Sequence, residues 1–422
     1  MKRSITVVAG AALMLAAGAV GAQAQVLFWS NQAVPVEETQ KMREQVLAGF
    51  PGGVDFQPQD PGPFITRIEA ESQAGSGSIG VVGGLHGELA TFPDFWVDLS
   101  DVDLGGVTPS PAFMELGKLG TDEQKYLPWM QATYVMAANR QALEYLPEGA
   151  DINALTYDQL IAWTQATAEA TGGPKFGFPA GPRGLKHRFF QGFLLPAYTG
   201  STVTEFRSEA AAGAWGKFKE LWQYTNPAST NYDFMQEPLL NGDVWIAFDH
   251  IARLGEAFNQ RPDDFVAFPA PAGPEGRAFM PVLAGVAVPS WAPDVEAAKQ
   301  LVAYMMQPEQ QVATLLATNF FPVTDAELPA DLSNSARALG PAVTAMTSAP
   351  DALPALLPVG LGELGGQFNQ VYIDAFERIV LGNQDIQQVL DQQGQTLRDL
   401  MVTANAPCWL PDAPSEGPCP VN

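Results

Sequence analysis

Three histidines are the residues of this sequence best suited to chemistry near neutral pH: His86, His187 and His250. Each falls just after a predicted strand or in a loop before a predicted helix. In open α/β sheets, ligands bind outside the carboxyl ends of the strands. These positions favour ligand binding by at least one histidine, with an ordinary surface position as the alternative. They do not favour a shared metal site.

One dense basic cluster stands in this acidic chain and comprises Arg183, Lys186, His187 and Arg188. Arginine can donate to ligand hydroxyls or to a carboxylate through its planar fork. The alternative is a solvated helix start, which is the commoner role of such a cluster. The sequence favours this alternative, and with it a neutral ligand, but leaves a binding role for Arg188 open.

An aromatic residue, Trp29, closes the first predicted strand and is followed by Ser30 and Asn31. Such a ring can act as a platform, because sugars present a C–H face to it and hydroxyls to polar neighbours. It can equally belong to the core. The sequence leaves both interpretations open.

Catalytic and cofactor signatures are missing from the sequence. Residues 75–80 match G-x-G-x-x-G, but a helix is predicted before them and a strand after them, the reverse of a dinucleotide site. Neither H-E-x-x-H nor G-x-S-x-G occurs. Asp101 and Asp103 fail as a calcium loop, because Gly105 and Ala112 occupy later ligand positions. We predict no catalytic residue, metal or cofactor, although the paired carboxylates of a glycosidase would leave no sequence signature.

The acidic balance of the chain excludes two classes of partner. Lys and Arg number 22 against 46 Asp and Glu, which gives a net charge of −24. Residues 1–24 hold two basic and no acidic residues, so a chain without them carries −26. Nucleic acids and anionic membrane surfaces need a basic footprint. Neither is expected as a partner.

The first 24 residues have the pattern of a secretory signal peptide. Lys2 and Arg3 precede an apolar stretch from Ile5 to Val20, and Ala22-Gln23-Ala24 forms an A-x-A cleavage site. We expect the mature protein to begin at Gln25. No Cys stands at the cleavage site, so we expect no lipid anchor and a free periplasmic protein. In that oxidising compartment the two cysteines, Cys408 and Cys419, should form a disulfide in the Pro-rich tail.

Strand-like and helix-like segments alternate along the chain and predict an α/β fold with covering helices around parallel sheets. The predicted strands are 26–29, 54–56, 79–82, 134–138, 176–178, 244–248, 265–268 and one ending at 286–289. The predicted helices are 36–50, 64–74, 156–171 with Thr156 as N-cap, 189–195, 210–224, 295–306, 367–381 and 386–402. About 400 residues are too many for one core, so two lobes are expected.

The order of several stretches resembles the extracellular solute-binding proteins of the sugar-binding type, the family of maltose-binding protein. The matching stretches are 126–129 leading to 138–140, 155–160, 240–245, 269–276, 283–288, 296–299 and 319–323. One departure is Ser78-Ile79-Gly80, where the family often has Pro-Asp before the third strand.

The resemblance implies a two-lobed periplasmic-binding-protein fold with a discontinuous chain and a ligand cleft between the lobes. The three hinge crossings should fall near 131–133, 282–284 and 320–323. The N-terminal lobe should comprise 25–131 and 285–320, and the C-terminal lobe 132–284 and 321–402. Residues 403–422 form the Pro-rich tail.

The resemblance also implies a function. The protein should capture a small polar solute, a carbohydrate or polyol, by hinge closure and deliver it to the permease of an ABC importer, acting as a monomer and not as an enzyme. The residues expected to contact the ligand are Trp29, Ser30, Asn31, His86, Arg188, Phe190, Asp249, His250, Arg253, Gly285, Phe320 and Asn369. Two alternatives stay open: a secreted enzyme such as a glycosidase, or the same fold with a sugar acid, phosphorylated polyol or polyamine as ligand.

Overall fold

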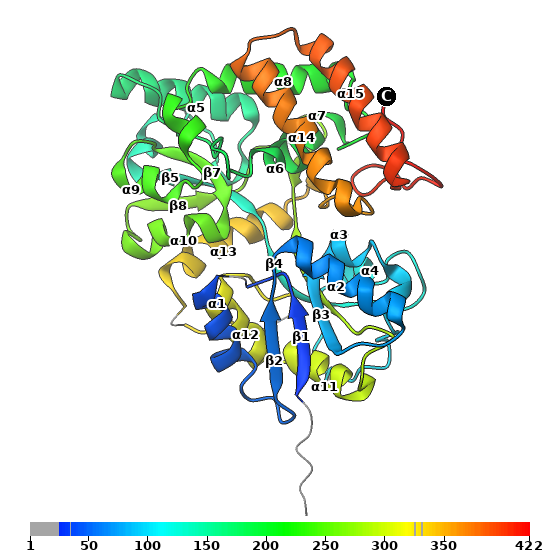
Figure 1. The fold of residues 1–422 in the computed structure, drawn as a ribbon. Helices are drawn as coiled ribbons and strands as arrows, with labels where there is room; N and C mark the ends of the chain where they lie inside the picture. The colour runs from blue at the N-terminus through cyan, green and yellow to red at the C-terminus, as the bar shows by residue number, and fades with distance from the viewer. Residues whose placement is uncertain (1–24, 34, 325, 331) are drawn as a thin grey trace, which may run out of the picture.

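The computed structural model describes residues 25–33, 35–324, 326–330 and 332–422. The predicted signal peptide lies outside them. Two lobes stand one above the other, with the first strands in the lower lobe and the last helices in the upper one (Figure 1). In the described part of the chain, no helix is long and apolar enough to cross a membrane.

The lower lobe is built on a five-stranded sheet with the order β2-β1-β3-β10-β4. Its strands are β1 (Val26–Ser30), β2 (Val54–Pro58), β3 (Ile79–Leu85), β4 (Leu127–Ala132) and β10 (Val282–Ala287). Strand β1 pairs parallel with β2 and β3, whereas β10 runs antiparallel to β3 and β4. A late strand thus completes an early sheet.

Two apolar layers cover the faces of this sheet. On one face, Phe28 of β1 clusters with residues of helix α11 (Val295–Met306) and of the π-helical turn Met42–Val46 that follows α1 (Val36–Lys41). On the other face, Trp29 clusters with Phe64 and Ile68 of α2 (Pro61–Ala74). Successive residues of a strand point to opposite faces, which is why Phe28 and Trp29 enter different layers.

The upper lobe is built on a four-stranded sheet with the order β6-β7-β5-β8. Its strands are β5 (Tyr134–Asn139), β6 (Phe176–Gly177), β7 (Ile246–His250) and β8 (Phe265–Phe268). Strand β5 runs antiparallel to β7 and β8. A two-stranded sheet joins β9 (Arg277–Phe279) to β11 (Ala352–Pro354). The core around the larger sheet holds a dense aromatic group, in which Phe178, Phe189 and Phe248 pack ring against ring.

The remaining helices have the following bounds: α3 (His86–Leu89), α4 (Pro111–Gly117), α5 (Tyr157–Thr171), α6 (Lys186–Phe189), α7 (Leu195–Thr199), α8 (Glu209–Trp222), α9 (Gln236–Asn241), α10 (Ile251–Gln260), α12 (Pro308–Thr318), α13 (Asn334–Thr347), α14 (Gly365–Phe376) and α15 (Ile386–Ala404). A π-helical turn, Phe190–Leu194, joins α6 to α7.

The predicted α/β class is confirmed, but the expected parallel sheets are in fact mixed. The reason is the path of the chain, because β5 and β10 enter their sheets antiparallel to their neighbours. The predicted helix start at Thr156 is confirmed: its Oγ1 accepts from the backbone N of Gln159 at 3.2 Å, as a capping box requires.

The chain passes between the two sheets at three adjacent places. Residue Thr133 stands between β4 and β5, and its Oγ1 donates to the carbonyl of Met280, just before β10, at 2.8 Å. The third passage lies between α12 and α13, where Gln131 and Phe321 exchange backbone hydrogen bonds of 2.9 and 2.7 Å. All three passages are therefore tied to one another.

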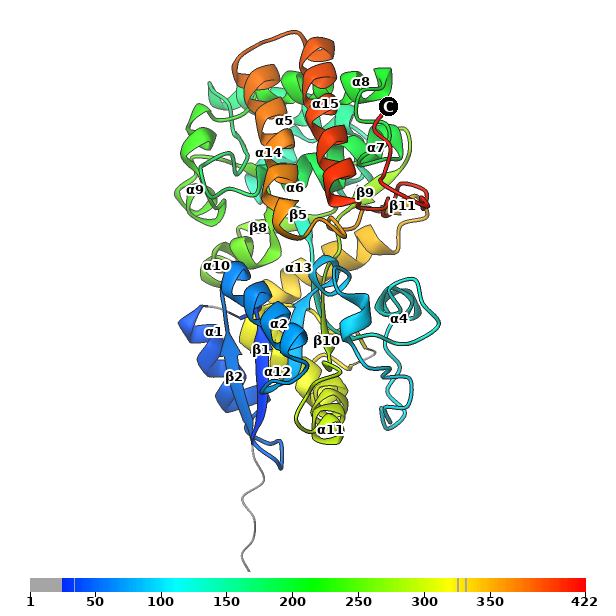
Figure 2. The ribbon, with the colours of Figure 1, turned by 45° about the vertical axis from the view of Figure 1, so that its right-hand side comes forward.

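The Pro-rich tail is closed by the predicted disulfide between Cys408 and Cys419. It lies against the upper lobe beside β9 and β11 (Figure 2).

Candidate functional site

A cavity of about 530 Å³ lies between the two lobes. The lower lobe contributes α2, the end of β3 and α3, and the upper lobe contributes α6, α14 and the segment that leads into α14. The lining residues are Gly62, Ile65, Thr66, Leu85, Gly87, Glu88, Thr91, Arg188, Leu357, Pro358, Leu361, Gly362, Glu363, Gly365, Gly366 and Asn369.

Two opposite charges face this cavity from different lobes. Glu88 of α3 accepts from Asn31 Nδ2 at 2.6 Å and from the backbone N of Leu85 at 2.8 Å. Burial raises the pKa of Glu88, while Asn31, the Leu85 N–H and Arg188 pull it back. Burial lowers the pKa of Arg188, opposed by Tyr134 and Glu88. Each charge thus favours the ionised form of the other across the cavity.

The upper wall of the cavity is organised by Gln191, which is fully buried. Its Oε1 accepts from Arg188 Nη1 at 3.3 Å, and its Nε2 donates to Asn369 Oδ1 at 3.0 Å. One amide therefore holds two cavity residues from different helices. The bond to Asn369 uses that residue's oxygen and directs its amide N–H groups elsewhere, as ligand recognition would need.

The backbones of the two lobes come close together at Gly87. A Cβ on this residue would stand 2.1 Å from the carbonyl oxygen of Pro358 in the upper lobe, well inside van der Waals contact. Only a glycine fits between the two backbones here.

Behind the cavity, His86 is buried and its Nδ1 lies 2.8 Å from the hydroxyl of Tyr126. Burial lowers the pKa of His86 to about 4, so the ring is neutral at pH 7. Gly285 makes room for this pair, because a Cβ there would meet the Tyr126 ring at 2.1 Å. Neither His86 nor Gly285 lines the cavity; they support the start of α3, which carries Glu88.

The three residues at the end of β1 that were predicted to bind ligand have different roles: Trp29 and Ser30 lie in the core, and Asn31 supports a cavity residue. Trp29 is 5% exposed, and its Nε1 donates to the carbonyl of Phe64 at 3.2 Å. The Arg67 guanidinium lies 4.4 Å from the ring centroid. Ser30 is fully buried and its Oγ accepts from the backbone N of Gln32 at 2.9 Å. Of this group, Asn31 alone reaches a cavity residue, Glu88.

The residues of the predicted basic cluster also lie in different surroundings. Arg183 is solvated and pairs with Asp233 at 3.0 Å. Lys186 is buried and donates to the carbonyls of Ala180 and Gly181. His187 is buried, its Nδ1 has no hydrogen-bond partner, and burial together with the neighbouring cations lowers its pKa to about 2.

Four further predicted residues gather near the hinge and do not line the cavity. Asp249 is fully buried and accepts from the backbone N of Met235 and of His250; burial raises its pKa to about 7. His250 caps α10, packs near Phe320 at 5.8 Å between ring centroids, and has its pKa lowered by burial to about 3. Arg253 donates to the carbonyl of Asp233 and lies over a phenylalanine ring.

Phe190 stands in the aromatic core of the upper lobe, where its ring lies 4.4 Å from that of Trp215. It is fully buried and does not line the cavity. Its neighbour Arg188 lines the cavity instead, and Gln191 holds Arg188 from behind through a hydrogen bond. The sequence analysis missed Glu88 and Gln191. Glu88 had a usable signal, since it follows the strand β3 closely and stands two residues after His86.

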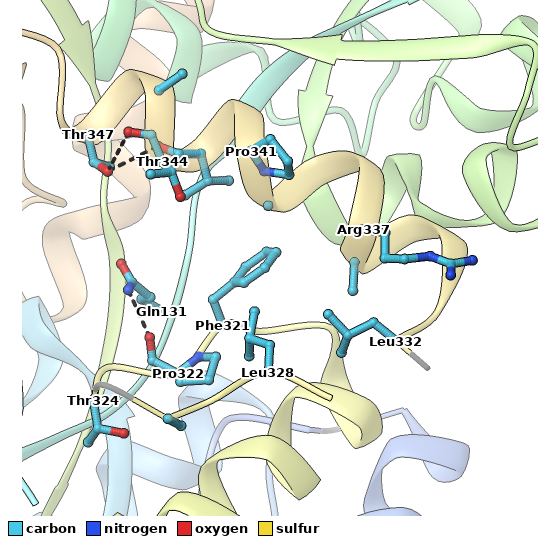
Figure 3. A pocket seen from close by; sticks show the side chains of 15 residues that line it. Gln131, Phe321, Pro322, Thr324, Leu328, Leu332, Arg337, Pro341, Thr344 and Thr347 are labelled. Atoms are coloured by element: carbon cyan, nitrogen blue, oxygen red, sulfur yellow. Dashed lines mark hydrogen bonds between the residues drawn. The ribbon is translucent and has the colours of Figure 1, made fainter. Parts of the chain in front are cut away.

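A second cavity, of about 720 Å³, lies at the hinge (Figure 3). Phe321, at the third passage between the lobes, points toward Pro341 of α13, and Leu328 and Leu332 lie beside it. The side chain of Gln131 is hydrogen-bonded to the backbone: its Nε2 donates to the carbonyl of Pro322 at 2.9 Å. This cavity offers mainly apolar surface and no pair of opposed charges.

Residues 48–340 match the family described as bacterial extracellular solute-binding protein. The chain belongs to this family. The expected recognition is thereby confirmed, and the protein is the solute-binding component of an ABC transporter and not an enzyme. Within the described residues, no group of His, Cys, Asp and Glu is arranged to hold a metal ion.

Solved structures with the same fold include sugar-binding proteins. Maltose-bound MalE3 of Thermotoga maritima is 16% identical with a TM-score of 0.69, and the match covers 89% of this chain and 100% of that one. The sugar-binding protein MalE of Xanthomonas citri is 15% identical with a TM-score of 0.70, covering 89% and 97%. The protein UgpB of Mycobacterium tuberculosis, in complex with glycerophosphocholine, is 16% identical with a TM-score of 0.66, covering 89% and 98%. No curated protein matches the sequence significantly.

Proposed function

We propose that this solute-binding protein captures a neutral carbohydrate or polyol in the cavity between its lobes. The observation that carries the proposal is the pair Glu88 and Arg188, which face the cavity from opposite lobes. A carboxylate accepts from ligand hydroxyls and a guanidinium donates to them, so a polyhydroxylated solute can connect the two lobes. Such a ligand stabilises the closed arrangement by its differential affinity for it.

The lining residues favour hydrogen bonding over ring stacking. Among the described residues that line the cavity, none is aromatic. The lining holds two carboxylates, Glu88 and Glu363, against the guanidinium of Arg188, which disfavours a simple anion as ligand. Within the same fold, relatives bind maltose in one case and glycerophosphocholine in another.

We propose that most of the binding affinity comes from three cavity residues, Glu88, Arg188 and Asn369. Asn31 supports them by holding Glu88 in place. Hinge closure, a cleaved signal peptide, a free periplasmic location and a monomer that docks on a permease complete the proposal. The family membership and the sequence pattern of residues 1–24 support it.

A thermal-shift screen of maltose, D-galactose, D-tagatose and glycerophosphocholine, followed by calorimetry, tests the proposal. We expect a neutral sugar or polyol to raise the melting temperature and to be recovered chemically intact. Affinity should be nearly independent of salt for a neutral ligand, because screening acts on charge pairs. Salt-sensitive binding of glycerophosphocholine, with no response to any sugar, would contradict a neutral sugar or polyol as ligand and indicate a charged phosphodiester instead. Turnover of a sugar would overturn the receptor function.

The variant Glu88→Gln identifies the cavity as the site. Glutamine keeps the shape and can still accept from Asn31 through its one oxygen, but it loses the charge and the bond from the Leu85 N–H. We expect about tenfold weaker binding, the scale of one charge-assisted hydrogen bond. The matched control is Glu148→Gln, an exposed carboxylate of the upper lobe that does not line the cavity, which should change affinity by less than about twofold.

A further inference from the structure

The C-terminal tail carries a buried carboxylate that accepts more hydrogen bonds than a tail closed only by a disulfide would need. Asp412 is 3% exposed and stands inside the loop closed by Cys408 and Cys419. It accepts from the backbone N of Thr202, Val203 and Thr204 at 2.8, 3.0 and 2.9 Å. It also accepts from the hydroxyls of Ser201 and Thr204 at 2.5 and 2.6 Å. These five bonds fix residues 201–204 to the tail.

One route leads from this turn to the cavity. Thr202 Oγ1 donates to the carbonyl of Gln191 at 3.0 Å, and the carbonyl of Thr202 accepts from the Tyr372 hydroxyl at 2.9 Å. Gln191 in turn holds Arg188 and Asn369 through its side chain. Three hydrogen-bonded steps, through Thr202 and Gln191, thus connect the carboxylate of Asp412 to the cavity residues Arg188 and Asn369.

A second route leads from the tail to the cavity wall. Half of the lining residues come from the segment 357–369. The backbone N of Leu356, next to this segment, donates to the carbonyl of Leu410 at 2.9 Å. The ring of Trp409 packs on Phe368 of α14 at 5.4 Å between centroids. The tail and β11 lie together at this edge of the upper lobe (Figure 2).

We propose that the disulfide-closed tail is a brace for the ligand cavity, with Asp412 as a positioning residue that fixes Arg188 and Asn369 through Thr202 and Gln191. The ligand-binding consequence rests on the proposed function, whereas the positioning itself does not. A tail that served stability alone would need neither the bond from Thr202 to Gln191 nor a contact with the cavity segment. The disulfide loop keeps Asp412 in place by limiting the conformations of residues 408–419.

Hydrogen exchange of the full chain without any solute tests the brace. In Asp412→Asn, an amide replaces the carboxylate opposite three N–H donors. We expect exchange in peptides 186–204 and 355–369 to accelerate on the order of tenfold, with β1, β5 and β7 unchanged, because local opening is independent of the core. The matched control, Glu416→Gln, removes an exposed charge from the same loop and should exchange like the wild type.

A chemical probe reports on Arg188 directly. Phenylglyoxal modifies accessible guanidinium groups, and mass spectrometry of the Arg188 peptide measures its rate. We expect faster modification in Asp412→Asn and in Thr202→Val, which removes only the hydroxyl that reaches Gln191. Thr202→Val also serves if Asp412→Asn fails to fold.

Three results would overturn the proposal. They are unchanged exchange in both peptides, uniform acceleration that includes β5 and β7, and an unchanged rate at Arg188 in both variants. For any solute of the screen that binds, affinity in Asp412→Asn should fall about tenfold, and an unchanged affinity would also reject the positioning role. If no solute binds, the proposed ligand class fails while the exchange and modification results still decide on the brace.

Discussion

The two cavities of this protein differ in size and in chemistry, and the smaller one is the better candidate for solute binding. The hinge cavity encloses about 720 Å³ and the cavity between the lobes about 530 Å³. The larger is bordered by Phe321, Leu328 and Leu332, whereas Glu88 and Arg188 face each other in the smaller. Volume measures room, but recognition of a polar solute needs convergent polar groups with fixed partners. Under the proposed function, buried charges identify the ligand site better than cavity volume does.

The largest effect on stability should come from Trp29→Ala, because Trp29 is a core residue that lines neither cavity. The ring packs between β1 and α2, so its removal leaves a cavity in the core. We expect a loss of about 3–5 kcal/mol in the free energy of unfolding, measured by denaturant titration. Solute affinity should stay within about twofold. A loss of affinity at nearly unchanged stability would mean that the Trp29 ring contacts the solute and that the binding site extends beyond the cavity lining.

Acid should destabilise the lower lobe beneath the smaller cavity through His86. Its folded pKa of about 4 lies below the ordinary value of 6.5, so the unfolded chain takes up the proton first as the pH falls. The free energy of unfolding should therefore fall by about 3 kcal/mol between pH 6.5 and 4 on account of this residue. In His86→Gln, which can still hydrogen-bond to the Tyr126 hydroxyl, the pH dependence of the free energy of unfolding should be shallower by that amount. An identical pH profile in both proteins would contradict the buried neutral ring.

The direct comparison of the two cavities uses one arginine from each. Arg188→Gln removes the guanidinium between the lobes and should weaken solute binding by about ten- to a hundredfold, measured by calorimetry. Stability should change less, because the partner Gln191 can bond to another amide. Equal affinity in variant and wild type would remove the basis for preferring the smaller cavity.

The smallest effect should follow from Arg337→Gln at the hinge cavity. This arginine bonds locally to Asn334 Oδ1 at the start of α13. We expect stability within about 0.5 kcal/mol of the wild type and unchanged affinity. A marked loss of affinity would mean that the hinge cavity takes part in recognition after all.

Much of the fold could be predicted from the sequence, because local patterns determine it. The alternation of short apolar strands with amphipathic helices gave the α/β class, and Thr156 with Gln159 marked a helix start. The mixed sheets could not be predicted, since the direction of β5 and β10 depends on where the chain passes between lobes. Nothing local in the sequence records that path.

The candidate site was predictable only in part. Arg188, singled out by the basic cluster, and Asn369, implied by the family resemblance, both line the cavity, but Phe190, directly before Gln191, points into the core. On a helix, a shift of one or two residues turns a side chain through a large angle, so a position in an alignment does not fix its direction. Trp29 and Ser30 illustrate the same difficulty on a strand, where neighbours face opposite layers.

The contact between Gly87 and the Pro358 carbonyl sets a lower limit on the distance between the lobes. In the proposed closure, a methyl group at residue 87 would act as a wedge and hold the lobes apart, so Gly87→Ala should enrich the open population while the polar groups of Glu88, Arg188 and Asn369 stay in place. Apparent affinity would fall in proportion to the fraction of molecules able to close. Small-angle scattering of the solute-bound variant would then report a larger radius of gyration than that of the wild type. In the proposed closure, the hydrogen atom at residue 87, in place of a methyl group, would set how far the two lobes can approach each other.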